Sequence, residues 1–125
     1  MKKLRRIFFV CVLALVTLFM VACTPDTVEE AKKKMEKEGY RVVVTKEKDE
    51  DYGMLAMLQI TSKSDPSDIT FAYYFDSIAS AKRYFGNDDD LNRLNKEFGD
   101  DDSLWRRHDR WVLLGSRRAI WDFRS

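Results

Sequence analysis

The feature that most constrains this chain is a 16-residue apolar stretch close to its N-terminus. It runs from Ile7 to Ala22, is interrupted only by Thr17, and follows a basic patch in residues 1–6. A membrane-spanning helix needs about 20 apolar residues, so this stretch is short for a permanent span. A basic patch followed by an apolar core of this length is typical of an export signal. We therefore expect residues 1–22 to take no part in the folded domain.

The apolar stretch ends in Met20-Val21-Ala22-Cys23, and polar residues follow at once. This tetrapeptide resembles the lipobox of bacterial lipoprotein precursors, although Met20 stands where leucine is commoner. The resemblance implies that diacylglycerol is attached to the Cys23 thiol and that the lipoprotein signal peptidase cuts between Ala22 and Cys23. Palmitate-type chains would then hold the protein on the extracytoplasmic side of the cell membrane. The alternative is an uncleaved signal anchor that ends in an ordinary cysteine.

Cysteine usage fits the lipoprotein interpretation. Cys11 lies inside the apolar stretch and would leave with it, whereas Cys23 would carry the lipid. The mature chain would therefore hold no disulfide, and its stability would depend on a hydrophobic core. We expect a signal peptide over 1–22, the lipidated cysteine and a short tether over 23–26, and a single domain over 27–125.

Hydrophobic periodicity predicts the elements of that domain. Thr27 and Glu30 form a capping-box pattern before a helix that ends near Gly39. Strands are expected where β-branched and aromatic residues run together or alternate with polar ones. The expected strands are 40–46, 54–61, 69–75, 104–108 and 111–114. A last helix is expected from Ser116, with Ile120 and Phe123 on one face.

The segment between the third and fourth strands leaves one choice open. Ile78, Ala81 and Phe85 share a helical face, but the polar run 86–90 breaks or kinks the helix before the spacing resumes at Leu91. The segment therefore holds one helix or two. Counted as one, the order is α-β-β-β-α-β-β-α, which predicts an α+β fold with helices packed on one face of an antiparallel sheet.

Two further segments resemble small uncharacterised lipoproteins of Gram-positive bacteria. One runs from Thr27 to Lys32 and on to Gly39-Tyr40, and the other comprises 111–116 with 119–123. Together they cover about a quarter of the chain. The resemblance implies no known activity.

Charge is distributed unevenly along the chain. The whole sequence has a formal net charge of +1, but segment 24–103 holds 12 basic and 19 acidic residues. Segment 104–125 holds six arginines, two aspartates and all three tryptophans. Arginine pairs with phosphate or carboxylate and stacks on aromatic rings, so the C-terminal segment suits an anionic partner. Nucleic acid is not expected, because the overall charge is near neutral and the site is extracellular.

The candidate partner-binding residues are the cations and aromatics of this C-terminal segment. They are Arg106, Arg107, Arg110, Trp111, Arg117, Arg118 and Trp121. Anionic lipid headgroups, an anionic wall polymer or an envelope protein could bind them. Alternatively, the tryptophans anchor the core while the arginines pair with acidic loops of the same domain. Among the strand aromatics we expect Phe71, Tyr73 and Phe75 in the core, which leaves Tyr74 as the candidate for exposure.

Catalytic and metal-binding signals are weak. His108 is the one histidine, and we expect a turn residue there because its neighbour Asp109 would point elsewhere. The carboxylate triplets 88–90 and 100–102 lack the pattern of a calcium loop. We therefore predict a non-catalytic binding module without cofactor or metal. The alternative is a small envelope hydrolase that uses His108 with distant carboxylates.

Overall fold

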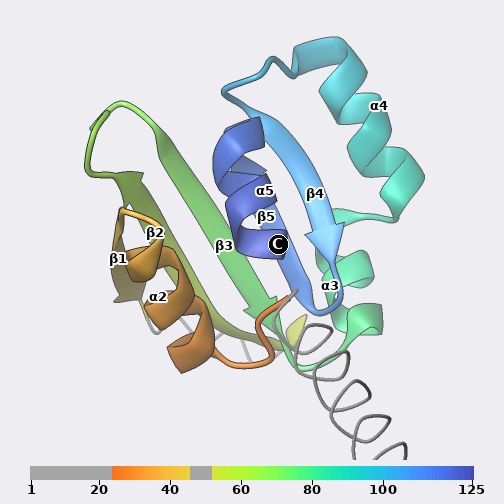
Figure 1. The fold of residues 1–125 in the computed structure, drawn as a ribbon. Coiled ribbons are helices and arrows are strands. Elements are labelled where there is room, and N and C mark those ends of the chain that lie inside the picture. Colours follow the sequence, from red (N-terminus) through yellow and green to blue (C-terminus); the bar gives the residue numbers. More distant parts are fainter. Residues whose placement is uncertain (1–23, 46–51) are drawn as a thin grey trace, which may run out of the picture.

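The computed structural model describes residues 24–45 and 52–125. Within them lies an antiparallel sheet of five strands in the order β1-β2-β3-β5-β4, together with four helices (Figure 1). The α+β class and the antiparallel sheet predicted from the sequence are confirmed. The elements are α2 (Val28–Lys37), β1 (Tyr40–Thr45), β2 (Met54–Ser62), β3 (Ile69–Phe75), α3 (Ile78–Phe85), α4 (Asp88–Phe98), β4 (Leu104–His108), β5 (Trp111–Gly115) and α5 (Arg117–Arg124).

The segment that the sequence left open forms two helices, so the order is α-β-β-β-α-α-β-β-α. Gly86 follows α3 with a φ of 95°, a left-handed conformation that glycine adopts without strain. Asn87 then caps α4 reciprocally with Asp90: each backbone N–H donates to the other's side chain, at 2.9 and 3.0 Å. The first carboxylate triplet is therefore the opening turn of a helix, where the helix dipole favours negative charge.

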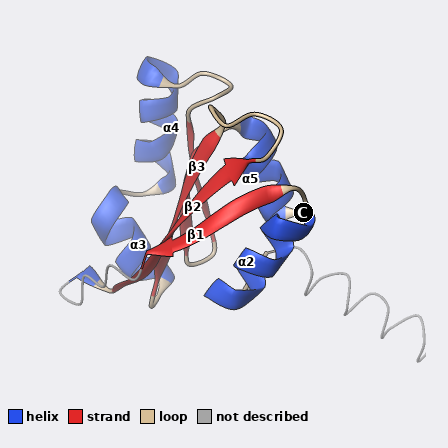
Figure 2. Ribbon diagram, turned by 90° about the vertical axis from the view of Figure 1, so that its left-hand side faces the viewer, coloured by secondary structure: helices blue, strands red, loops and turns tan. Residues whose placement is uncertain are grey.

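Helices cover both faces of the sheet, which corrects the expectation that they pack on one face (Figure 2). α2 and α5 lie side by side on one face, where the Lys34 ammonium donates to the carbonyl of Phe123 at 2.9 Å. α3 packs on the other face, and α4 runs along the edge strand β4. The physical reason is that β5 carries apolar side chains on both sides: Trp111 faces α5, and Val112 faces α3.

The larger core lies under α2 and α5 and centres on Trp111, whose side chain is fully buried. Its ring centroid lies 4.4 Å from that of Tyr74 and 5.0 Å from that of Phe123. Tyr74 is only 7% exposed, so the expectation that it was the candidate for exposure is wrong. Of the three β3 aromatics expected in the core, Phe75 is buried, whereas Tyr73 is half-buried against the second core and Phe71 is half-buried outside both cores, because Phe71 lies beyond the part of the sheet that α3 covers.

The second core lies under α3 and is built mainly from aromatic rings. Phe75 is fully buried there, and Tyr73, Phe85 and Trp105 pack against it partly exposed. A register irregularity between Met54 and Ala56 in β2 turns the Met54 side chain into this second core.

The outer edge of β4 is covered by α4. The Asn95 side chain accepts from the backbone N–H of Trp105 at 2.7 Å and donates to its carbonyl at 2.8 Å. The Asn95 amide thus makes the two hydrogen bonds with Trp105 that a neighbouring strand would otherwise make. Covering the edge in this way removes a site at which another chain could pair.

Gly115 provides a test of how tightly β5 and β3 pack. A Cβ atom there would lie 2.0 Å from Thr70 Oγ1 and 2.4 Å from Thr70 Cβ, and Thr70 is fully buried. We expect Gly115→Ala to lower the free energy of unfolding by about 1–3 kcal/mol, because the backbone must move to admit the methyl group. Urea unfolding measures this change. Lys33→Ala on the exposed side of α2 is the control, and equal midpoints for the two variants would contradict the packing.

Candidate functional site

The seven residues that the sequence proposed as a partner-binding set lie in different environments. Trp111 and Arg110 hold the segment next to Cys23, whereas Arg107 forms an ion pair with α4. Arg106 faces a groove beside α4. Only Arg117, Arg118 and Trp121 share an exposed surface on α5.

Residues 25–26 are held by a set of contacts that we call the N-terminal clamp, made by Tyr74, Arg110 and Trp111. The buried indole Nε1–H of Trp111 donates to the carbonyl of Pro25 at 2.8 Å. Arg110 Nη2 donates to the carbonyl of Asp26 at 3.1 Å, and the Tyr74 hydroxyl donates to the same oxygen. The Arg110 guanidinium also donates to the Tyr74 hydroxyl and lies 4.8 Å from the centroid of its ring. Burial raises the pKa of Tyr74, which keeps this hydroxyl protonated as a donor.

The clamp revises the expectation of a tether over residues 23–26. Pro25 is buried, so the folded domain extends at least to that residue. The physical reason is that a buried indole N–H needs an acceptor, and the Pro25 carbonyl supplies it. Trp111 is therefore an internal group, whereas Arg110 is half-exposed and makes its contacts within the domain. Cys23 and the predicted cleavage site lie outside the described residues.

Arg107 ties β4 to the first turn of α4. Its Nε lies 2.9 Å from Asp88 Oδ1, and its Nη2 donates to Asp88 Oδ2 at 3.1 Å. The Arg107 side chain is only 16% exposed, and this paired guanidinium holds the pKa of Asp88 below its usual range. A two-pronged pair of this kind fixes the orientation of the helix and leaves Arg107 unavailable to a partner.

The exposed surface on α5 is built around Trp121, which is 63% exposed. It borders a hollow of about 560 Å³ that also touches Arg117, Arg118 and the acidic residues Asp68, Asp101 and Asp102. Arg117 contacts Asp101 at 3.2 Å, but both side chains are mostly in solvent, so the pair is weak. Arg118 makes no ion pair within the part of the chain that the structure describes.

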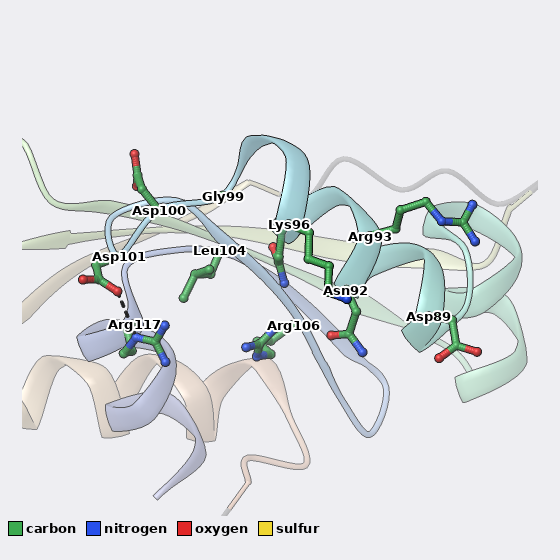
Figure 3. A pocket seen from close by; sticks show the side chains of 11 residues that line it. Asp89, Asn92, Arg93, Lys96, Gly99, Asp100, Asp101, Leu104, Arg106 and Arg117 are labelled. Atoms are coloured by element: carbon green, nitrogen blue, oxygen red, sulfur yellow. Dashed lines mark hydrogen bonds and ion pairs between the residues drawn. The ribbon is translucent and has the colours of Figure 1, made fainter.

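A larger groove of about 720 Å³ lies between α4, the edge strand β4 and the start of α5 (Figure 3). In Figure 3, Lys96 and Asn92 extend from α4 on one side of the groove and Arg106 lies on the other, while Arg117 lies beside Asp101 and Arg93 and Asp100 point away. Arg106 Nη1 donates to the Trp105 carbonyl at 3.1 Å. The lining residues are Asp89, Asn92, Arg93, Asn95, Lys96, Gly99, Asp100, Asp101, Leu104, Arg106 and Arg117.

The sequence analysis missed the contribution of α4 to this groove. Asn92 and Lys96 are four residues apart, and Arg93 and Lys96 are three apart, so a helix brings each pair together. That spacing was visible in the sequence. The missing information was that α4 lies against β4, which brings Lys96 toward Arg106.

His108 lacks the surroundings of a catalytic base. Burial lowers its pKa, and the nearby charges of Arg124, Arg106 and Arg107 lower it further. Across residues 24–45 and 52–125, it forms no hydrogen bond with a carboxylate or hydroxyl. It lines neither the groove nor the hollow on α5. The geometry therefore gives the hydrolase alternative no support.

The described residues hold neither a metal-binding cluster nor a membrane-spanning helix. They contain no cluster of three or more histidine, cysteine, aspartate or glutamate side chains able to hold a metal ion. None of their helices combines the length and the apolar character needed to cross a bilayer.

Comparison with known proteins gives no relative. The chain matches no protein-family model, and no similar curated protein or solved structure was found. Any functional conclusion therefore depends on the residues themselves.

The N-terminal clamp can be tested with a single hydroxyl. Tyr74→Phe should lower the free energy of unfolding by about 0.5–1.5 kcal/mol, because the Asp26 carbonyl and Arg110 each lose one hydrogen bond. Tyr84→Phe is the matched control, since that hydroxyl makes no hydrogen bond within the described segments. Urea unfolding of both variants measures the difference, and equal stabilities would contradict the clamp.

Proposed function

We propose that this chain is the precursor of a lipid-anchored cell-envelope protein whose domain is a non-catalytic binding module on the extracytoplasmic side of the membrane. The proposal of a lipid anchor rests on the order of two features along the chain. The lipobox-like Met20–Cys23 is followed by the N-terminal clamp, with only Thr24 between Cys23 and the buried Pro25. A lipid on Cys23 would therefore hold the folded domain directly at the membrane.

The binding role is supported by the cations that line the α4 groove. Lys96 and Arg106 form no ion pair inside the described chain, and Arg117 has only a weak, exposed one. Arginine forms forked hydrogen bonds to phosphate or carboxylate groups. Because Arg117 and Asp101 border both the groove and the hollow on α5, the two form a continuous surface that reaches the exposed Trp121.

The position of this surface distinguishes among the three candidate partners. Ser116, at the start of α5, donates from its backbone to Thr70, whereas the clamp contacts Tyr74, four residues further along β3. The strand separates these two points by roughly 13 Å. The hollow on α5 and the end of the groove at residues 99–101 thus lie away from the end that carries Cys23, whereas Arg106 lies level with Ala72 in the middle of β3. This favours an anionic wall polymer over the headgroups of the anchoring membrane, since an open groove beside an exposed indole suits a sugar-phosphate chain.

The anchor is tested by metabolic labelling with a palmitate analogue. We expect wild type and Cys11→Ala to incorporate the label equally and Cys23→Ala to lose it, because only the thiol at position 23 accepts the lipid. Gel fluorescence and intact mass measure the outcome. Equal labelling of Cys23→Ala would reject Cys23 as the lipidated residue, and a mass that retains residues 1–22 would show an uncleaved signal anchor instead.

The binding role is tested by cosedimentation of the detergent-solubilised protein with isolated cell walls. We expect the double variant Lys96→Ala/Arg106→Ala to lose most of the binding, and wild-type binding to weaken at high salt. Arg41→Ala, an exposed cation on β1, is the control. Walls stripped of their anionic polymers should bind little. Undiminished binding to stripped walls would reject the polymer and point to an envelope protein.

A further inference from the structure

The end of the sheet at the N-terminal clamp brings several distant segments together (Figure 1). The backbone N–H of Phe75 donates to the carbonyl of Arg110 at 3.0 Å, which joins the end of β3 to the turn between β4 and β5. The N–H of Asp76 donates to the carbonyl of Gly53 at 2.9 Å, which places Tyr52 and the start of α3 at the same end. This end therefore has its own surface, formed largely by α3 and Tyr52.

Three large apolar side chains are exposed on that surface. Tyr52 is 50% exposed, and Ile78 and Tyr84 are each 41% exposed. The rings of Tyr52 and Tyr84 contact each other edge to face, with centroids 5.4 Å apart. We call these three residues the clamp-end patch. Tyrosine combines an apolar ring with a polar hydroxyl and is therefore enriched where a bilayer meets water.

Basic residues of α3 accompany the patch. Lys82 and Arg83 are both exposed, and neither forms an ion pair within the stretch of chain described. Their stems can lie along an apolar surface while the charged ends stay in water. Each cation held near an anionic leaflet contributes about 1 kcal/mol of attraction. Hydrogen bonds from other side chains are the main cause of the lowered pKa of Asp76 and Asp88, and the nearby charges of Arg83 and Lys82 lower it further, but neither cation forms a close ion pair with these carboxyls. Tyrosines with adjacent exposed cations match the chemistry of an anionic headgroup layer.

The short distance between Cys23 and the clamp favours the membrane over other partners for the clamp-end patch. Consecutive Cα atoms are 3.8 Å apart, so the Cα of Cys23 lies within about 8 Å of the Cα of Pro25. Pro25 is held by the buried Trp111 indole, so the clamp stays within this distance of the anchor while the surface around it sets the orientation of the domain. If Cys23 carries lipid, the clamp end must lie close to the headgroups.

We infer that the clamp-end patch rests in the headgroup region of the membrane that carries the anchor, with Lys82 and Arg83 on anionic headgroups. This inference rests on the proposed lipidation of Cys23. The domain then stands on the membrane with its strands steeply inclined to the surface. The α4 groove and Trp121 face outward, toward the wall.

The orientation is tested with a fluorophore on a single introduced thiol. Lipid on Cys23 and loss of Cys11 leave the mature chain without a free thiol, so Ala79→Cys on the exposed side of α3 and Ser103→Cys near the groove can each be labelled alone. The lipidated protein is reconstituted into vesicles of phosphatidylglycerol and phosphatidylethanolamine in equal parts, with a trace of headgroup nitroxide lipid. We expect the nitroxide to quench the label at position 79 strongly and the label at position 103 little. Equal quenching at the two positions overturns the inference.

A second set of variants separates contact by the patch from the effect of the anchor alone. Tyr52→Ser/Tyr84→Ser should lose most of the quenching at position 79, whereas Val43→Ser, which alters an exposed residue in mid-strand, should not. Undiminished quenching in the double variant would show that the patch does not hold the orientation. Intact mass is measured on every sample first. A mass without diacylglycerol rejects the proposed anchor and this inference together, while an acylated protein with equal quenching rejects the inference alone.

Discussion

The rest of the structure depends on the burial of Trp111. Its indole fills the centre of the larger core between Tyr74 and Phe123, yet it carries an N–H group that cannot be left without an acceptor. The carbonyl of Pro25 meets that need from the opposite end of the chain. One hydrogen bond therefore joins β5, the last strand along the chain, to the segment that follows the predicted lipidation site. Tyr74 and Arg110 reinforce it through the next carbonyl, that of Asp26.

This contact gives the domain two ends with different surface chemistry. One end holds both the clamp, on the face covered by α2 and α5, and α3, on the opposite face, whose exposed tyrosine and basic side chains suit a headgroup layer. At the other, the start of α5 and the groove beside α4 present cations to the surroundings. In the proposed function, anchoring and binding are therefore separated along the strand direction. A small domain anchored close to its folded part would then present its far end to the wall without a second anchor.

The C-terminal segment shows how far sequence reasoning reaches. Its basic, tryptophan-rich composition drew attention to the region that includes the exposed cations of α5. The alternation of a strand nevertheless sends neighbouring side chains to opposite faces. Arg107 is paired with Asp88, whereas Arg106 faces the groove. On α5 the helical period buries Phe123 and leaves Trp121 exposed. Residues of this one short segment therefore have three different roles: some are core residues, some form an internal ion pair, and some are exposed.

The sequence by itself determined the local elements and the class of fold. Period-two alternation marked the strands, and capping residues marked the helix starts, because both signals arise from contacts within a few residues. Only the tertiary structure decided that helices cover both faces, that Tyr74 is buried, and which arginines stay unpaired. Those outcomes depend on partners far along the chain, such as Asp26 for Arg110, 84 residues away. Charge and periodicity cannot reveal such a partner, since they do not specify which distant carbonyl or carboxylate lies beside a given side chain.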